Sequence, residues 1–166
     1  AYAGSITSRS IALTSSAVGA AGVTYHVTAT AQTAISANGV LIVEFCSDSP
    51  LVGLACTHPS GLTVASVNTT GSTTAGTATD FDNLGDHATI KWVSTGAISG
   101  GGSIDINFTG IHNPTAVGTF YARVTSYANT TDLGTYVDDD TPGTIADSGG
   151  IALSTTNNIG VTAYVK

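Results

Sequence analysis

Short segments in which apolar and polar residues alternate run through most of this sequence. The alternation is clearest in residues 23–31, 103–111 and 119–127. A period of two places alternate side chains on opposite faces of a β-strand. The side chains predicted to face the core are Val23, Tyr25, Val27 and Ala29, then Ile104, Ile106 and Phe108, then Phe120, Ala122 and Val124. No stretch of ten residues follows helical spacing, so the pattern predicts an all-β fold.

The remaining segments complete a single β-sandwich or jelly-roll-like domain of about nine or ten short strands. Residues 40–46 are almost continuously apolar, as in a central strand. Further strands are predicted at 62–67, 88–94, 149–154 and 159–166, and the Thr-rich stretch 68–79 is predicted to be an exposed loop or edge. The 20 glycines mark turns between strands, and only 9% of residues are charged. Strands at this spacing favour a sandwich of two sheets.

The N-terminal part divides the chain into residues 1–22, a strand with a joint, and residues 23–166, the sandwich body. Residues 1–14 have a weak strand pattern that includes Ile6, Ile11 and Leu13, and residues 15–22 are small and predict a flexible joint. Such a tether allows the strand to pair with its own sheet or with the sheet edge of another copy. Head-to-tail exchange that does not close a ring produces a filament.

Cys46 and Cys56 are the two cysteines of the chain. A structural zinc site needs about four ligands, and the only candidate near this pair in sequence is His58. The C-x-x-C spacing of a thioredoxin-like redox centre is absent. A disulfide that closes a short loop fits the spacing better than a metal site or two free buried thiols. A disulfide in turn predicts an oxidising, extracellular location.

Charge and hydropathy exclude two classes of partner. The net charge is −7 with four Lys and Arg residues, and a polyanion-binding surface needs clustered cations. No apolar run approaches the roughly 20 residues that span a bilayer. The sequence therefore predicts neither nucleic-acid binding nor membrane insertion. Three sequons, at Asn68, Asn107 and Asn129, are possible N-glycosylation sites.

The sequence offers little that predicts catalysis. The four histidines carry no recognised motif, and neither a G-x-S-x-G elbow nor an H-E-x-x-H pair is present. Glu44 lies in the central strand, where pairing with Arg123 or with a backbone donor would offset the cost of burial. We therefore expect a protein that is not an enzyme and has no cofactor. Consecutive Asp138, Asp139 and Asp140 are weak calcium candidates, and a solvated acidic loop is the alternative.

Two motifs resemble a family of small secreted surface proteins of candidate-phyla-radiation bacteria (Patescibacteria, Saccharibacteria-like). The first motif is carried by Cys46, Pro50, Leu51, Cys56, Thr57, Pro59 and Gly61, and the second by Asn113, Pro114, Gly118, Thr119, Phe120, Tyr121 and Arg123. The resemblance covers residues from about 10 to the end. It implies an exported cell-surface protein with a pilus-like or coat role, and it transfers no catalytic residue.

Two functions remain as hypotheses. The first is a structural subunit of an extracellular filament or pilus, a homopolymer joined by exchange of the N-terminal strand. The second is a monomeric adhesion or carbohydrate-binding module at the cell surface. Glycan binding needs exposed aromatic side chains, and the alternation places Tyr121 and Tyr127 on the outer face of one strand.

Overall fold

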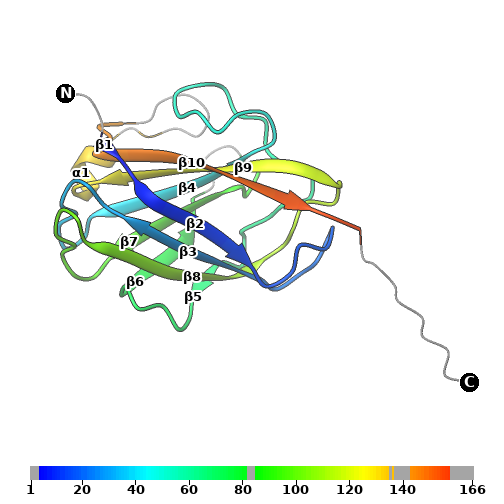
Figure 1. Cartoon of the computed structure of the whole chain (residues 1–166), viewed down its shortest axis with the longest axis horizontal. Helices are drawn as coiled ribbons and strands as arrows, with labels where there is room; N and C mark the ends of the chain where they lie inside the picture. Colours follow the sequence, from blue (N-terminus) through cyan, green and yellow to red (C-terminus); the bar gives the residue numbers. More distant parts are fainter. Residues whose placement is uncertain (1–3, 82–84, 135, 137–142, 158–166) are drawn as a thin grey trace, which may run out of the picture.

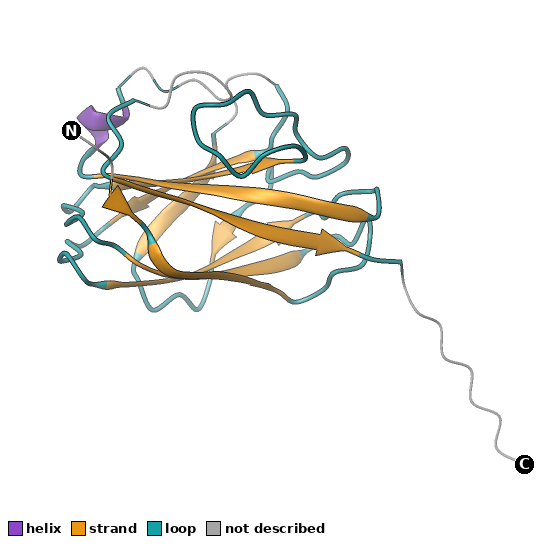
Figure 2. Cartoon of the chain, turned by 45° about the horizontal axis from the view of Figure 1, so that its top comes forward, coloured by secondary structure: helices purple, strands orange, loops and turns teal. Residues whose placement is uncertain are grey.

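The computed structural model describes residues 4–81, 85–134, 136 and 143–157, and these form two β-sheets packed face to face (Figures 1 and 2). The described elements are β1 (Gly4–Ser5), β2 (Thr7–Leu13), β3 (Val23–Thr30), β4 (Val40–Cys46), β5 (Asn68–Thr69), β6 (Gly76–Asp80), β7 (Thr89–Ser94), β8 (Ser103–Ile111), β9 (Gly118–Tyr127), α1 (Thr130–Leu133) and β10 (Asp147–Thr155). One sheet has the order β1-β10-β9-β4-β7-β6, and the other has the order β2-β3-β8-β5. The predicted all-β sandwich is confirmed.

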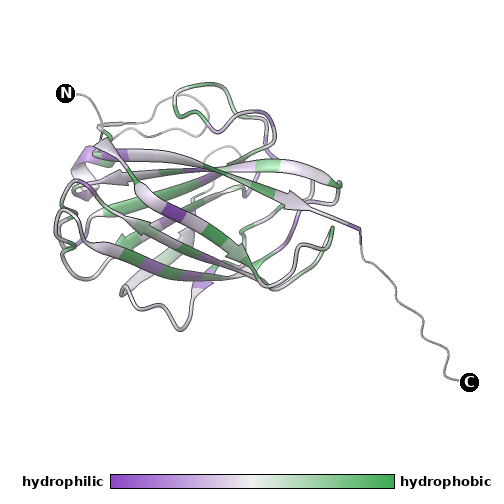
Figure 3. Ribbon diagram, in the orientation of Figure 1, coloured by the Kyte–Doolittle hydropathy of each residue, from purple (hydrophilic) through white to green (hydrophobic). Residues whose placement is uncertain are grey.

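The main core lies between the sheets and contains the side chains that the alternation predicted. All ten residues predicted to face inward on β3, β8 and β9 are buried. Tyr25 of the four-stranded sheet meets Phe45 of the six-stranded sheet edge to face, with ring centroids 5.5 Å apart. Coloured by hydropathy, several strands carry apolar and polar bands in alternation (Figure 3). Burial of one face per strand is what holds the two sheets together.

The central strand β4 is buried on both faces, which explains its unbroken apolar sequence. Leu41, Val43 and Phe45 enter the main core. Val40 and Ile42 face the other way, into a second cluster. Its members are Val40, Ile42, Tyr127 and Leu133, with Phe81, Val93, Tyr136 and Ile145 packed against them. The six-stranded sheet is therefore covered on its outer face as well.

This second cluster corrects the expectation for Tyr127. The residue is on the outer face of β9, as the alternation predicted, yet its exposed fraction is 0%. The ring of Tyr136 meets it edge to face at 6.4 Å. The alternation gives the face of a strand but not what covers that face. Tyr127 is therefore unavailable for stacking on a sugar, and Tyr121 is only partly exposed.

The N-terminal segment pairs within its own subunit in this structure. β1 pairs in parallel with β10, and β2 pairs antiparallel with β3. The chain therefore crosses from the edge of one sheet to the edge of the other at Ile6, whose exposed fraction is 0%. In Figure 1, β2 leaves the N-terminal end beside β10 and diverges from it along its length. Strand formation in residues 7–13 agrees with the sequence pattern.

The predicted flexible joint at residues 15–22 is instead hydrogen-bonded to the sandwich. The Asn113 amide donates to the carbonyls of Ser15 and Ala17, both at 2.9 Å. The backbone of Thr156 bonds both Ser16 and Val18. Small side chains predict a flexible joint because they favour a loose chain. Here they let the backbone approach its neighbours closely.

One further prediction needs correction, and one element was not predicted. Residues 62–67 form no strand, because they contain a turn, and the isolated bridge between Thr63 and His112 is their only described ladder contact. The short helix α1 was not predicted. Its signal is Asn129, whose side chain accepts from the amide of Asp132 and caps the helix. The predicted strand at 159–166 lies outside the described residues.

Candidate functional site: the disulfide-closed loop

The segment from Cys46 to Cys56, named here the knob loop, closes on itself at the end of β4. The predicted disulfide is present, with the two Cα atoms 5.3 Å apart. Next to it, the Ser47 amide and hydroxyl both donate to the Thr57 carbonyl, at 2.7 and 2.8 Å. The Thr57 amide in turn donates to the Asp48 carboxylate at 3.1 Å. The two arms of the loop are therefore held together by one covalent bond and three hydrogen bonds.

Arg123 of β9 fixes the knob loop from below. Its exposed fraction is 2%. The guanidinium donates to the carbonyls of Ser49, Leu54 and Ala55 at 3.1, 2.7 and 3.1 Å. It also bonds the Glu44 carboxylate at 3.2 Å, which is one of the two kinds of partner that the sequence suggested for Glu44. A planar group with five donors suits this task, because it satisfies several acceptors at fixed positions.

Asp48 helps to hold the loop because its side chain is a charged carboxylate that accepts hydrogen bonds. Burial acts to raise the pKa of this carboxyl, but hydrogen bonds from the amides and hydroxyl around Thr57 and Ser49 outweigh it, so the pKa lies below its usual value. The carboxylate is therefore ionised, and remains an acceptor, at neutral pH.

The knob loop rests on β10 and turns two leucines outward. A Cβ placed on Gly150 would lie 2.6 Å from the Cβ of Pro50, so the loop packs directly on the bare backbone of β10. Leu51 and Leu54 have exposed fractions of 60% and 51%. In Figure 1 the loop, in cyan, projects above β9 and β10. The arrangement presents apolar side chains to solvent from a rigid base.

A small apolar pocket lies near the base of the same loop. Its volume is about 100 Å³, and its lining includes Pro59, Pro114, Val117 and Phe120. Val117 at its rim is the third large apolar residue, with Leu51 and Leu54, that the described structure exposes. Pockets for drug-sized ligands are about 300–1,000 Å³. The cavity is therefore sized for one aliphatic side chain rather than for a small-molecule ligand.

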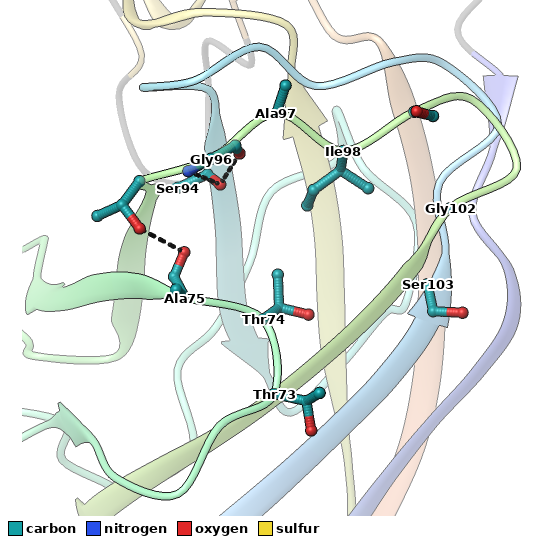
Figure 4. Close-up of a pocket in the computed structure, with 11 residues that line it drawn as sticks. Thr73, Thr74, Ala75, Ser94, Gly96, Ala97, Ile98, Gly102 and Ser103 are labelled. Carbon is teal, nitrogen blue, oxygen red and sulfur yellow. Dashed lines mark hydrogen bonds between the residues drawn. The ribbon is translucent and has the colours of Figure 1, made fainter.

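A larger groove of about 450 Å³ lies at the opposite edge of the sandwich (Figure 4). Hydroxyl groups dominate its lining, which consists of Thr73, Thr74, Ala75, Ser94, Thr95, Gly96, Ala97, Ile98, Ser99, Gly102 and Ser103. Several of these hydroxyls are already used within the protein, such as Ser94 on the Gly96 carbonyl and Thr95 on the Ala75 carbonyl. The lining contains no aromatic, amide or charged side chain. It therefore lacks the aromatic platform that glycan binding needs.

The histidines near these sites are paired with carboxylates. His26 bonds Asp105 at 3.0 Å on the outer face of the four-stranded sheet. His58 bonds Asp86 at 2.6 Å beside the knob loop. His87 bonds Asp80 near the β6 edge. None of these pairings was predicted, since nothing in the sequence separation of the partners indicates them.

The three sequons differ in how their side-chain amides are used. Asn107 donates to the Gly71 carbonyl at 3.0 Å, and Asn129 donates to the Asp132 carboxylate at 2.9 Å while it caps α1. Asn68 is exposed, and its oxygen accepts from the amide of Thr69. Asn68 is thus the sequon best placed for modification. The calcium candidates Asp138, Asp139 and Asp140 lie outside the described residues.

The residues predicted for strand exchange are all engaged in the same subunit. Ile6 is fully buried in the main core, and Ile11 and Leu13 of β2 pack against it half-buried. Sequence reasoning missed Asn113, which accepts from the Tyr25 hydroxyl at 2.8 Å while it holds the joint. The Asn-Pro motif drew attention to Asn113, but the sequence did not indicate which groups its side chain contacts.

No known protein-family model matches this sequence, and no curated protein matches it significantly. In the part of the chain that the structure describes, no helix has the length and apolar character to cross a membrane.

Proposed function

We propose that this protein is an exported structural subunit of a cell-surface homopolymer, a filament or coat, in which the knob loop of one copy inserts into the small apolar pocket of the next. The observation that carries the proposal is the exposure of Leu51 and Leu54 on a loop that a disulfide and Arg123 hold rigid. A rigid loop loses little entropy on binding, and buried leucines supply the affinity.

The choice of a second copy as the partner rests on the pocket beside Val117. Its size fits one aliphatic side chain, and its lining matches the leucines of the knob loop in chemistry. The pocket lies beside the base of the knob loop, with Ser47 in its lining, and a contact in which the knob of each copy enters the pocket of the next is heterologous. Such contacts form open chains when the rotation does not close. The resemblance to exported surface proteins and the disulfide both support an extracellular site of assembly.

Strand exchange becomes the less favoured mode of assembly. To donate residues 4–13 to a neighbour, a subunit would have to remove Ile6 from its core and break the pairing of β2 with β3. It would also have to release Ser15 and Ala17 from Asn113. A contact between preformed surfaces requires none of these steps.

A locked variant separates the two modes of assembly. Ser10 and Thr28 are directly opposite on β2 and β3, with side-chain oxygens 2.7 Å apart. The double variant Ser10→Cys/Thr28→Cys should form a disulfide that holds β2 in its own subunit. We expect this variant to assemble like the unmodified protein in sedimentation and electron microscopy. Leu51→Asp/Leu54→Asp should remain monomeric with unchanged circular dichroism.

The opposite result would overturn the proposal. Assembly that is lost in the oxidised Ser10→Cys/Thr28→Cys variant and restored by reduction would establish strand exchange. Assembly that persists in Leu51→Asp/Leu54→Asp would exclude the knob loop. A protein that stays monomeric at every concentration would favour an adhesion module instead.

A further inference from the structure

Four side chains capable of binding a metal lie beneath the knob loop, and two of them, Cys46 and Cys56, form the disulfide that closes it. Glu44 and Cys46 are two residues apart on β4, so both point to its outer face. Cys56 and His58 are likewise two residues apart on the returning arm of the loop. The amide of Ser47 bonds the carbonyl of the residue between them at 2.7 Å, which places the two arms side by side.

The distances within this cluster are close to those of a metal site. A carboxylate oxygen of Glu44, Sγ of Cys56 and a ring nitrogen of His58 lie within 4.8 Å of one another. Sγ of Cys46 lies 3.8 Å from Oε2 of Glu44. In tetrahedral zinc sites, bonds of about 2.0–2.3 Å place neighbouring ligand atoms roughly 3.3–3.8 Å apart. The two sulfurs are bonded at 2.01 Å, so the disulfide must open before both can take up that spacing.

We propose that reduction of the Cys46–Cys56 disulfide converts this cluster into a Zn²⁺ site with Cys46, Cys56, His58 and Glu44 as ligands. A dithiol or phosphine reductant supplies two electrons and is itself oxidised. The S–S bond breaks, and the two sulfurs take up two protons as thiols. Zinc binding then releases both protons to solvent, because the sulfurs coordinate as thiolates.

The residues around the cluster are those that a zinc site uses. Ligating histidines commonly bond a carboxylate through the other ring nitrogen. Nδ1 of His58 is 2.6 Å from the Asp86 carboxylate, so Nε2 would be the coordinating atom. Arg123 lies 3.2 Å from the Glu44 carboxylate. Zinc with two thiolates and one carboxylate carries one negative charge, and the buried guanidinium balances it.

Zinc binding would preserve the closed loop after the disulfide is lost. The disulfide joins the two arms directly, whereas the metal would join the same arms through four ligands. The knob loop would then keep its shape in both redox states. Removal of both cross-links would leave Arg123 and the hydrogen bonds of Ser47 and Asp48 to hold the loop.

The test uses the full chain with Co²⁺ as a spectroscopic probe and Zn²⁺ as its competitor. We expect the reduced protein to bind one equivalent of Co²⁺ with thiolate-to-cobalt charge-transfer bands that Zn²⁺ abolishes. The oxidised protein should show no such bands. His58→Gln should weaken Zn²⁺ binding by at least about tenfold. The matched variant His112→Gln, which changes a half-buried histidine outside the cluster, should bind as the unmodified protein does.

Three results would overturn the inference. The first is the absence of stoichiometric Co²⁺ uptake by the reduced protein. The second is equal affinity in His58→Gln and His112→Gln, which would mean that the thiols bind metal without the cluster. The third is loss of the near-ultraviolet circular dichroism on reduction without recovery on addition of Zn²⁺, because a preformed site should restore the fold around it.

Discussion

At the scale of single residues, Arg123 is a buried charged group whose side chain connects the knob loop to the central strand β4. Its donors serve three carbonyls of one loop and the carboxylate of the central strand. A buried ion pair contributes little net stability by itself, because both charges lose water. Removing one partner is costly, since the other charge stays buried and uncompensated.

We therefore expect Arg123→Met to lower the free energy of unfolding by about 3–5 kcal/mol, measured by denaturant titration. Arg9→Met is the matched control, because Arg9 is exposed and also donates to carbonyls, those of Ile6 and Gly150. Its loss should be about 1 kcal/mol. Equal effects in the two variants would show that the Arg123 cluster does not hold the knob loop.

Two buried tyrosines make a second prediction at this scale. Burial, with a smaller contribution from the charge of Glu44, raises the pKa of Tyr127 to about 12. Burial also raises the pKa of Tyr25. In the unfolded chain both ionise near pH 10. Their contribution to stability is therefore fully present below pH 10 and is lost as the pH rises toward the folded values.

The free energy of unfolding should fall between pH 10 and 12 by up to about 1.4 kcal/mol per pH unit for each tyrosine. Denaturant titrations over this range measure the slope. Tyr127→Phe should remove the contribution of Tyr127 to this slope. A slope that is flat, or unchanged by Tyr127→Phe, contradicts the burial of this residue.

At the scale of elements, the N-terminal segment is an integral part of the sandwich rather than an appendage. It supplies the edge strand of one sheet, adds β1 to the other, and fills the core at Ile6. Ile6→Ala should therefore cost about 2–5 kcal/mol of stability, the usual range for a fully buried isoleucine. Ile11→Ala, at a half-buried position, should cost less. Denaturant titration of both variants tests this, and a negligible effect of Ile6→Ala would mean that the segment is detached.

At the opposite edge of the four-stranded sheet, polar side chains take up the hydrogen bonds of the backbone of β8. The backbone amides of Asp105 and Asn107 on β8 donate to the hydroxyls of Thr74 and Ser72. The Asp105 carbonyl accepts from the Thr74 amide. Hydroxyl groups thus occupy backbone positions where another strand could otherwise pair, which protects the edge from aggregation. The Thr-rich stretch 68–79 has this role.

The sequence predicted the strands well because alternation reports which side chains a sheet buries. Val23 to Ala29 and Ile104 to Phe108 are placed by that pattern alone. It failed where a second layer covers a sheet, as at Tyr127, because a residue pattern does not reveal a distant partner. The spacing of the cysteines predicted the disulfide, and the sequence offered Arg123 as one of two kinds of partner for Glu44. It did not predict Asn113, His58 with Asp86, or the order of residues 15–22, since these depend on long-range backbone contacts.

At the scale of the whole molecule, the protein combines few charges with exposed leucines on the knob loop and a small apolar pocket near its base. With 9% charged residues and a net charge of −7, long-range repulsion between copies is weak at physiological salt. The large apolar side chains that the described structure exposes are Leu51, Leu54 and Val117. Exposed apolar groups on a rigid base are what a subunit needs for contact with a neighbour.

The most direct test of the proposed assembly is a cross-link between two differently labelled copies. One copy carries Leu54→Cys and the other carries Val117→Cys, and the two are mixed and oxidised under conditions that leave the Cys46–Cys56 bond intact. We expect mixed dimers at a yield well above that of either variant alone, because the knob loop of one copy lies in the pocket of the other. Mixed dimers no more abundant than random collision gives, in a sample that assembles, would contradict it.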